Sequence, residues 1–171
     1  MYNTFNMIIV KKTGYLKYKN FNFRCALGKS GIKIKKQEGD NVTPIGIFKI
    51  IKIYYRDDKI KKIKTPIKKI KIKKNMGWCD DPKSSFYNQQ IELPSKFSYE
   101  KLYRNDCIYD LLAVLNYNLN PVIKNKGSGI FIHIAKRKYK PTAGCIALKK
   151  SDLIRLLQII KKNTKIKIST N

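Results

Sequence analysis

Short apolar stretches alternate with Gly, Asn, Asp and Pro from residue 8 to residue 72, a pattern typical of successive β-strands. The clearest alternation lies at residues 130–135, where isoleucine occupies every second position and Phe, His and Ala occupy the positions between. A period of two residues predicts a strand, so the histidine at position 133 should point to one face of it. Residues 145–148 and 165–168 predict two further short strands.

Two helices are predicted in the second half of the chain. The first covers residues 98–115 and ends before the Asn-rich stretch that leads to Pro121. Four apolar residues of this segment would share one face of a helix: Ile108, Leu111, Leu112 and Leu115. The second helix begins at Ser151, with Asp152 in its first turn, where a negative charge is favourable.

The lysine-rich segment 59–74 admits two interpretations. Its isoleucines fit a helical stripe, whereas its β-branched content and Pro66 favour two short strands with the lysines facing solvent. We expect strands. The whole pattern predicts a mainly β fold, a sandwich or open barrel with two or three peripheral helices, formed as a single domain over residues 1–171.

The charge balance bears on the partners of the protein. The formal net charge is +27, with 38 Lys and Arg against 11 Asp and Glu, which would suit an anionic partner. Most of the basic residues are lysines scattered among Ile and Asn, and the lysine-rich segment lacks interleaved aromatic residues on which bases could stack. Nucleic-acid binding is therefore not expected, and a solvated basic surface accounts for the pattern.

Neither a membrane span nor an export signal is visible in the sequence. No apolar run reaches the length of about 18 residues that a transmembrane helix needs. Residues 1–12 have no basic start, a very short apolar stretch and no small-residue cleavage site. A cytoplasmic location is therefore compatible with the sequence.

Candidate chemistry centres on the single histidine, His133, and on Cys145, which follows Gly144. A thiol attacks as the thiolate, and an imidazole that accepts its proton could later return that proton to a leaving group. Gly144 would allow a substrate to approach the thiol closely. The alternative, in which His133 and Cys145 are both structural residues, is the commoner case for an isolated pair.

The other three cysteines give a weaker signal. The sequence has no CxxC pair and no second histidine, so neither a zinc site nor another metal site or cofactor is expected. Cys25 and Cys107 have apolar neighbours and are expected to be buried. Cys79 competes with Cys145, but the two aspartates that follow it would raise the pKa of its thiol and make it a poorer nucleophile.

The sequence resembles the L,D-transpeptidase (YkuD-like) family, whose motif places a histidine on a strand before a Gly-Cys pair. Gly-Asp…Thr-Pro-Ile-Gly-Ile-Phe is the most specific further block, and Trp-Cys-Asp-Asp is a less specific one. The matching blocks span most of the chain: residues 25–31, 38–48, 77–81, 87–88 and 103–106.

The resemblance implies a bacterial cell-wall acyltransferase with a mainly β, L,D-transpeptidase-like fold. Cys145 would be the nucleophile and His133 the base, and the N–H groups of Gly144 and Cys145 would hold the oxyanion. A backbone carbonyl of the turn at residues 127–129, with Ser128 as the most plausible residue, would orient the imidazole. The partners would be peptidoglycan stem peptides and a D-amino acid or amine acceptor, with no cofactor. The expected location is the cell envelope or periplasm.

Two departures from the family pattern concern the substrate carboxylate. Ala143 and Ala147 stand where many members carry a second His and an Arg or Asn. A guanidinium fork matches a carboxylate in a way that alanine cannot replace. Arg56, Arg104 and Arg137 are the candidates to hold the carboxylate instead, with Arg56 favoured, although an exposed side chain or a surface ion pair is the commoner role for any one arginine. Thr142, Trp78 and Asp81 are also expected to contact substrate, and the segment 78–81 has the alternative of bracing a loop.

The sequence leaves four functions open. An amine acceptor would give cross-linking or D-amino-acid exchange, whereas water would give an L,D-carboxypeptidase. A different cysteine hydrolase would turn over peptides without D-centres. A non-catalytic basic module that binds cell wall or nucleic acid would carry a Cys145 no more reactive with iodoacetamide than a free thiol.

Overall fold

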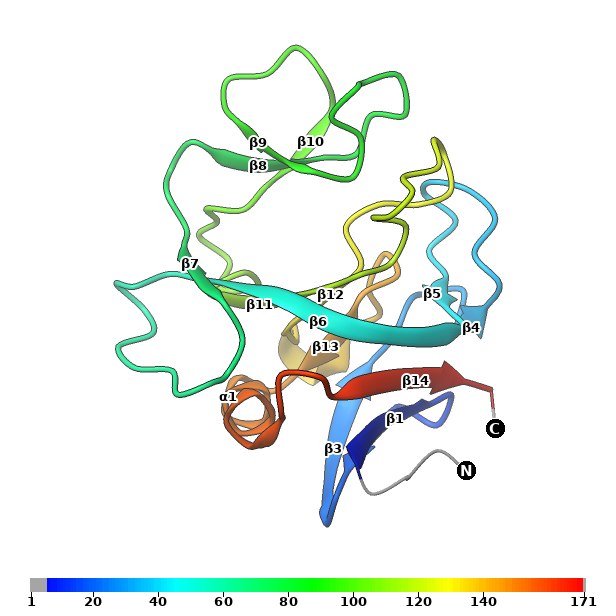
Figure 1. Ribbon diagram of the computed structural model, residues 1–171, viewed down its shortest axis with the longest axis vertical. Helices are drawn as coiled ribbons and strands as arrows, with labels where there is room; N and C mark the ends of the chain where they lie inside the picture. Colours follow the sequence, from blue (N-terminus) through cyan, green and yellow to red (C-terminus); the bar gives the residue numbers. More distant parts are fainter. Residues whose placement is uncertain (1–5, 171) are drawn as a thin grey trace.

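The computed structural model describes residues 6–170, and strands dominate it (Figure 1). Eight strands close into a barrel-like ring in the order β11-β12-β13-β3-β2-β1-β14-β6, because β6 also pairs with β11. Their bounds are β1 Met7–Lys11, β2 Tyr15–Tyr18, β3 Phe21–Ala26, β6 Gly46–Tyr55, β11 Leu111–Leu115, β12 Phe131–Ile134, β13 Ile146–Leu148 and β14 Lys165–Ser169. The predicted mainly β, barrel-like fold is confirmed.

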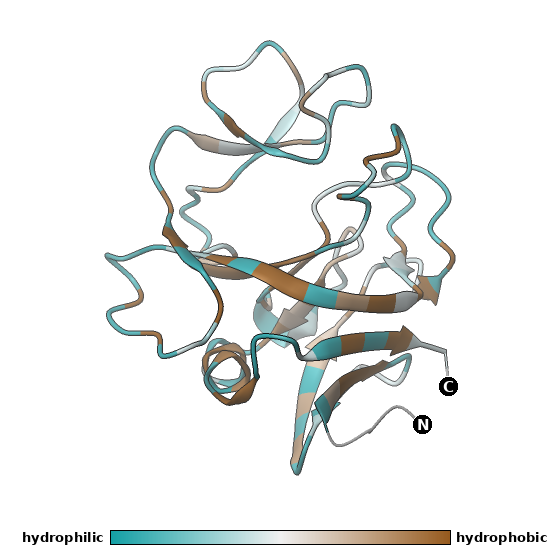
Figure 2. Cartoon of the chain, in the orientation of Figure 1, coloured by the Kyte–Doolittle hydropathy of each residue, from teal (hydrophilic) through white to brown (hydrophobic). Residues whose placement is uncertain are grey.

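The long strand β6 closes the ring. Residues 46–49 pair with β14, and residues 50–55 pair with β11. The short strand β7, Lys69–Lys71, joins β6 beside the ring. β1 and β14 pair in parallel from one end to the other, so the first and last strands are neighbours. Apolar and polar residues alternate along β14, as Figure 2 shows, because one of its faces is in the core.

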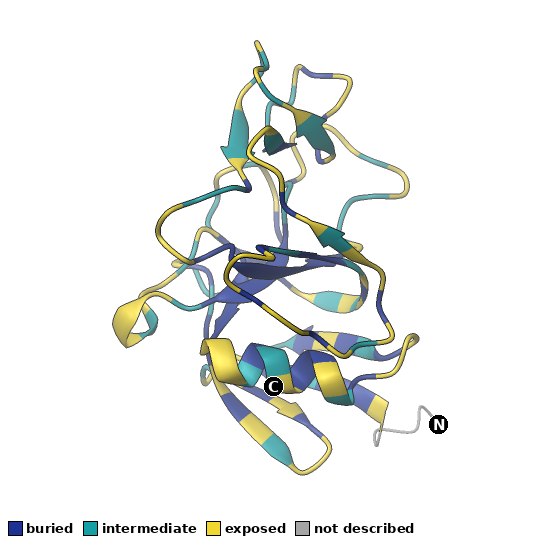
Figure 3. Ribbon diagram, turned by 90° about the vertical axis from the view of Figure 1, so that its left-hand side faces the viewer, coloured by how far each residue is buried: buried dark blue, intermediate teal, exposed yellow. Residues whose placement is uncertain are grey.

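Two apolar cores lie on opposite faces of β11. Leu111, Ala113 and Leu115 pack into the interior of the ring. Leu112 and Val114 belong to the second core, which lies beneath a three-stranded sheet that we call the cap. The cap consists of β8 Met76–Cys79, β9 Gln90–Glu92 and β10 Tyr99–Lys101. In Figure 3 the buried strands occupy the middle of the molecule, between the loops of the cap and the α-helix.

The predicted helix at residues 98–115 is wrong. β10 and β11 occupy this segment, joined by a loop, and every residue of β11 is buried. An apolar run that is buried on both faces carries no strand alternation, and its spacing therefore also fits a helical stripe. The single α-helix of the described residues is α1, Lys150–Ile159, where the second helix was predicted. Two or three peripheral helices were therefore too many.

The lysine-rich segment 59–74 forms one strand, β7, rather than two. Ile60, Ile63 and Ile67 lie outside the strand and pack into the main core, whereas the lysines between them are exposed. The segment is therefore a loop anchored by its isoleucines, with the solvated lysine surface that was expected. A short two-stranded sheet, β4 Ile32–Lys33 with β5 Thr43–Pro44, flanks the ring.

Three expectations concern single features. Cys25 is buried as predicted, but Cys107 is exposed, and both are free thiols, as are the other two cysteines. None of the helices within residues 6–170 combines the length and the apolar character that a membrane crossing requires. Residues 1–5, on which the expectation about an export signal partly depends, lie outside the described residues.

Candidate active site

His133 and Cys145 lie on neighbouring parallel strands. His133 is in β12 and Cys145 immediately precedes β13. The register pairs His133 with Ala147, two residues after Cys145, so the two side chains point to the same face of the sheet. Both line one cavity of about 380 Å³, and Ala143 and Ala147 line the same cavity. The structure therefore brings the two predicted catalytic residues to a single cavity.

The Cys145 thiol is held by the main chain of the segment before β12. Its Sγ donates a hydrogen bond to the carbonyl of Gly129 at 3.2 Å and accepts one from the N–H of Phe131 at 3.3 Å. The residue is only 8% exposed, and this burial raises the pKa of the thiol to about 12. In this state the group is a protonated thiol across the neutral range.

The imidazole of His133 is oriented by the next residue of its own strand. Nδ1 lies 2.9 Å from the carbonyl of Ile134, which can only accept, so Nδ1 carries the proton and Nε2 has a free lone pair. Burial lowers the pKa of His133 to about 4, and the ring of Tyr109 packs edge-on against it. The expectation that Ser128 would orient the ring is wrong: Ser128 lines the cavity, and Ile134 supplies the acceptor.

The Gly144–Cys145 turn is fixed by two threonine hydroxyls. Thr142 Oγ1 accepts from the N–H of Gly144 at 3.1 Å and donates to the carbonyl of Cys145, and Thr43 Oγ1 donates to the carbonyl of Gly144 at 2.9 Å. Gly144 has a φ of +137°, and a Cβ there would lie 2.8 Å from the carbonyl oxygen of Val42. Because its N–H is already bonded to Thr142, Gly144 does not offer the free oxyanion donor that was expected.

A side-chain amide fixes the carbonyl that holds the thiol. Asn88 Oδ1 accepts from the N–H of Gly129 at 2.9 Å and from the indole of Trp78 at 3.1 Å. The amide nitrogen of Asn88 donates in turn to the carbonyls of Tyr117 and Asn118. Trp78 therefore lines the cavity and also braces the Cys145 environment. The positioning role of Asn88 was missed, although its block was among those that carried the resemblance.

Asp81 does not reach the cavity. Its carboxylate accepts from the N–H of Lys83 at 2.9 Å and from the N–H of Ser98 at 3.4 Å, so it braces a loop of the cap. The expectation that Asp81 contacts substrate is therefore wrong, and the alternative of a loop brace fits. The neighbouring Asp80 lines the cavity instead.

Arg56 is a structural residue rather than a substrate ligand. It is 5% exposed, and its guanidinium forms a two-pronged bond with Asp58 and donates to the carbonyl of Arg104 at 2.9 Å. The Tyr103 ring lies beneath it, with 3.6 Å between Cζ and the ring centroid. All of these contacts are away from the cavity wall, so the substrate role expected for Arg56 is wrong.

Arg104 does line the cavity, although it is not free. Its guanidinium pairs with Asp106 and lies over the ring of Tyr109. Arg137 lies in an exposed 3₁₀ turn and is absent from the cavity wall. Three lysines that the sequence did not single out also line the cavity: Lys35, Lys136 and Lys140.

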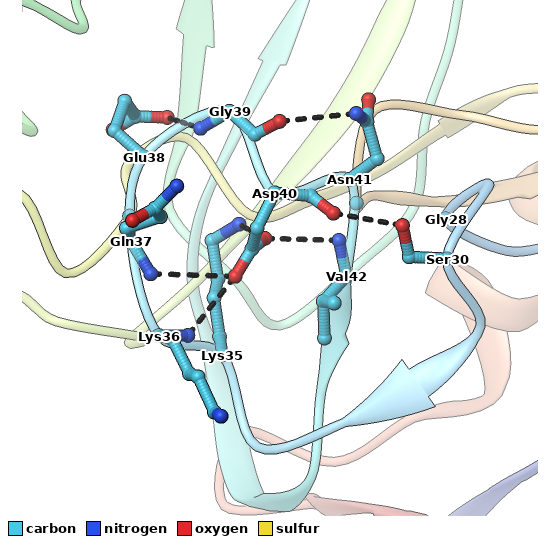
Figure 4. Close-up of polar contacts among 12 residues, drawn as sticks. Gly28, Ser30, Lys35, Lys36, Gln37, Glu38, Gly39, Asp40, Asn41 and Val42 are labelled. Atoms are coloured by element: carbon cyan, nitrogen blue, oxygen red, sulfur yellow. Dashed lines mark hydrogen bonds and ion pairs between the residues drawn. The ribbon is translucent and has the colours of Figure 1, made fainter.

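Lys35 is part of a rigid loop around Asp40 (Figure 4). The carboxylate of Asp40 accepts from Lys35 Nζ and from the main-chain N–H groups of Lys36, Gln37 and Val42. Burial alone would raise the pKa of Asp40, but these hydrogen bonds lower it to about 2. The loop therefore holds a nearly buried cation in the wall beside Cys145.

The cap contributes two acids to the same cavity, Asp80 and Glu100. The hydroxyl of Tyr109 donates to Glu100 at 2.8 Å, and burial raises the pKa of Glu100. Asp80 Oδ1 is buried and has no hydrogen-bond partner among the described residues. No group of three or more His, Cys, Asp or Glu within residues 6–170 is arranged to hold a metal ion.

Comparisons with known proteins agree with this geometry. The family model described as YkuD, L,D-transpeptidase catalytic domain, matches residues 5–168. No curated protein matches the chain. The solved structure of Bdellovibrio bacteriovorus Bd1075 is similar to it, with a TM-score of 0.51 and 16% sequence identity over 97% of this chain and 48% of that one. The chain thus spans about half the length of that relative, and the likeness shows a shared fold.

The family match extends over the ring, the cap and the cavity between them. It includes the strand that carries His133 and the turn that carries Cys145. The chain therefore belongs to the YkuD family of L,D-transpeptidase catalytic domains.

Proposed function

We propose that the protein is a cysteine acyltransferase that acts on peptidoglycan stem peptides. The observation that carries the proposal is the pairing of a buried thiol with a neutral imidazole in one cavity. Cys145 and His133 share a sheet face, and hydrogen bonding at Nδ1 leaves Nε2 able to accept a proton. The family supports a cell-wall substrate. Such a substrate would place the protein in the cell envelope.

The reaction would proceed through a thioester. Cys145 Sγ forms a bond to the carbonyl carbon between an L-residue and a D-residue, while its proton passes to Nε2 of His133. The C–N bond then breaks, and the same proton leaves with the amine of the departing D-amino acid. An amine acceptor or water next attacks the thioester, gives its proton to Nε2 and releases the thiol.

The tetrahedral intermediate needs a donor for its oxyanion. Because the N–H of Gly144 is engaged by Thr142, we assign this role to the N–H of Cys145. Thr142 would act as a positioning residue, since its hydroxyl fixes the peptide units on both sides of the Gly144–Cys145 bond. Ser128 and Trp78, which also line the cavity, would contact the stem.

The carboxylate of the departing D-residue requires a cation near the base. Arg104 and Lys136 both line the cavity, and their positive charges both lower the pKa of His133. They therefore act on the imidazole that would protonate the leaving amine. We propose that Arg104 and Lys136 hold this carboxylate, because Ala147 occupies a position at which many family members carry an Arg or Asn.

Mass spectrometry of the acyl-enzyme tests the proposal. Purified protein is incubated with tetrapeptide muropeptides and an isotopically labelled D-amino acid, beside the Cys145→Ala variant. Cys107→Ser is the matched control, because Cys107 is exposed and does not line the cavity. We expect a thioester mass and labelled product from the wild type and from Cys107→Ser, and neither from Cys145→Ala.

The products also assign the acceptor. Incorporation of the labelled D-amino acid indicates exchange, whereas a tripeptide without label indicates L,D-carboxypeptidase action. Turnover of all-L peptides at a similar rate would favour a different cysteine hydrolase. No adduct and no product from well-folded protein, across several stems, would overturn the proposal in favour of a non-catalytic binding module.

A further inference from the structure

The neighbouring strands β2, β1, β14 and β6 form a surface on which cationic and apolar side chains alternate. The register places Ile9 between Lys17 and Lys167, and Lys167 beside Ile47. The chain neighbours of these residues pack into the interior of the ring, so the four side chains point outward. We call them the outer row. Because neighbouring strands lie about 4.8 Å apart, the outer row is roughly 14 Å long.

The surface around the outer row carries cations and no acid. None of the 11 acidic residues of the sequence lies in β1, β2, β6 or β14. Two further exposed lysines extend the positive charge beyond the outer row, Lys11 in β1 and Lys49 in β6. None of the ion pairs found among residues 6–170 involves any of these four lysines. The surface therefore presents an uncompensated positive field to the solvent.

Exposed apolar side chains lie within this positive field. Ile47 is 52% exposed, and Tyr15, which is opposite Lys11 in the register, is 43% exposed. Ile45, directly before β6, is 41% exposed. An anionic bilayer suits both kinds of side chain, because its headgroups attract lysines and its interface takes up aliphatic and tyrosine side chains. A soluble polyanion would satisfy the lysines alone.

We propose that the outward face of β2, β1, β14 and β6 docks the protein on the surface of a bilayer that contains anionic phospholipids. The lysines of the outer row contact the headgroup phosphates, and their apolar stems lie beside the acyl chains. Ile47 and Tyr15 enter the boundary between headgroups and acyl chains. A second copy of the chain is a poor partner for the same face, because two positive surfaces repel each other.

Docking in this way leaves the cavity of Cys145 accessible. No residue of the four strands lines that cavity. In Figure 1, β1 and β14 lie at the opposite end of the molecule from the cap. The inference does not rest on the proposed function, since the face and the cavity are built from different residues.

Vesicle binding tests the docking. The full chain is sedimented with phosphatidylcholine vesicles and with vesicles in which about one third of the lipid is phosphatidylglycerol. We expect the partition coefficient to be at least about tenfold higher for the anionic vesicles, and to fall as salt is added. Equal partition into both kinds of vesicle, or none into either, would overturn the inference and leave a solvated basic surface.

Matched charge variants assign the binding to this face. The double variant Lys17→Gln/Lys167→Gln removes two cations of the outer row and should lower the partition coefficient about thirtyfold. Lys61→Gln/Lys62→Gln is the control, because it removes the same charge from exposed positions in the lysine-rich loop. It should stay within about threefold of the wild type. Equal losses in the two double variants would show that only total charge matters, which would overturn the docking face.

An apolar variant separates a bilayer from a soluble polyanion. Ile47→Ser should lower partition into anionic vesicles about fivefold and leave binding to polyphosphate unchanged. Vesicle binding by Ile47→Ser equal to that of the wild type would overturn the bilayer in favour of a soluble polyanion. All of these variants should form the thioester with soluble stems as the wild type does. The lack of a thioester in the wild type would overturn the proposed function and leave the docking inference intact.

Discussion

The thiol of Cys145 donates its hydrogen bond to the main-chain carbonyl of Gly129, 3.2 Å away. In the proposed reaction the thiol gives its proton to His133, so this bond would have to break first. The carbonyl is held in place through the bond from the Gly129 N–H to Asn88. The free protein therefore holds Cys145 as a protonated, sheltered thiol.

The first prediction concerns the pH dependence of thiol reactivity. The Cys107→Ser variant is used, which removes the exposed thiol, and alkylation of Cys145 is followed by mass spectrometry without substrate. Because burial raises the pKa of Cys145 to about 12, the rate should rise about tenfold per pH unit from pH 7 to 10 with no plateau. Glutathione should level off near its ordinary thiol pKa. A plateau for Cys145 below pH 8 would contradict the prediction.

Slow alkylation at neutral pH is consequently not evidence for a non-catalytic module. The sequence suggested the rate of alkylation as a way to separate a binding module from an enzyme. A buried thiol bonded to the Gly129 carbonyl, however, would be alkylated slowly even if it is the nucleophile. The discriminating measurement is the thioester formed with substrate.

His133 should make stability depend on pH. Burial lowers its pKa to about 4, below the usual 6.5, so its contribution is fully present above pH 6.5 and is lost as the pH falls through about 4. A lowering of this size corresponds to about 3 kcal/mol of unfolding free energy. Urea unfolding at pH 7, 5.5 and 4.5 should show a steeper loss for wild type than for His133→Gln. Parallel curves for the two proteins would contradict it.

The Gly144 position should not accept a side chain. Gly144→Ala combines a φ of +137° with a Cβ placed 2.8 Å from the Val42 carbonyl, so the turn before Cys145 must move. We expect a cost of about 2–4 kcal/mol in urea unfolding together with loss of activity. Gly31→Ala is the control, because Gly31 has a φ of +77° but open space around its Cβ, and it should cost about 1 kcal/mol. Equal costs would show that the Val42 contact does not matter.

Arg56 and Arg104 should separate stability from substrate binding. Arg56→Ala removes the bonds of a buried guanidinium to the half-exposed carboxylate of Asp58 and to a main-chain carbonyl, so it should lower the free energy of unfolding and leave KM within about twofold. Arg104→Ala should instead raise KM about tenfold or more, since its guanidinium lies at the cavity. The opposite pattern would restore the substrate role once expected for Arg56.

The fold was predictable for strands that have one apolar and one polar face, and for the helix whose start and apolar stripe are visible in the sequence. β14 alternates in this way, and the second helix has its apolar stripe and first-turn acid. β11 was not predictable from its pattern because Leu112 and Leu111 face different cores, which erases the alternation. The existence of the second core depends on the cap, and no local pattern reveals that a distant sheet covers a strand.

The meeting of His133 and Cys145 in one cavity was predictable because thiol and imidazole chemistry restricts the residue types. Its supporting groups were not, because they are set by three-dimensional contacts. Ile134 orients His133 through a carbonyl that every residue type possesses. Asp80 and Asp81 are adjacent and chemically identical, yet one lines the cavity and the other braces a loop, which follows from the direction of the chain after β8.

The parallel pairing of β1 with β14 has a consequence for biosynthesis. A ribosome makes residues 7–11 early and residues 165–169 late, so the ring cannot close until β14 has emerged. Until then β1 and the first half of β6 each present an unpaired edge, to which other nascent chains can add. The time taken to translate the residues between β6 and β14 therefore sets the shortest period for which the newborn chain is exposed to this hazard.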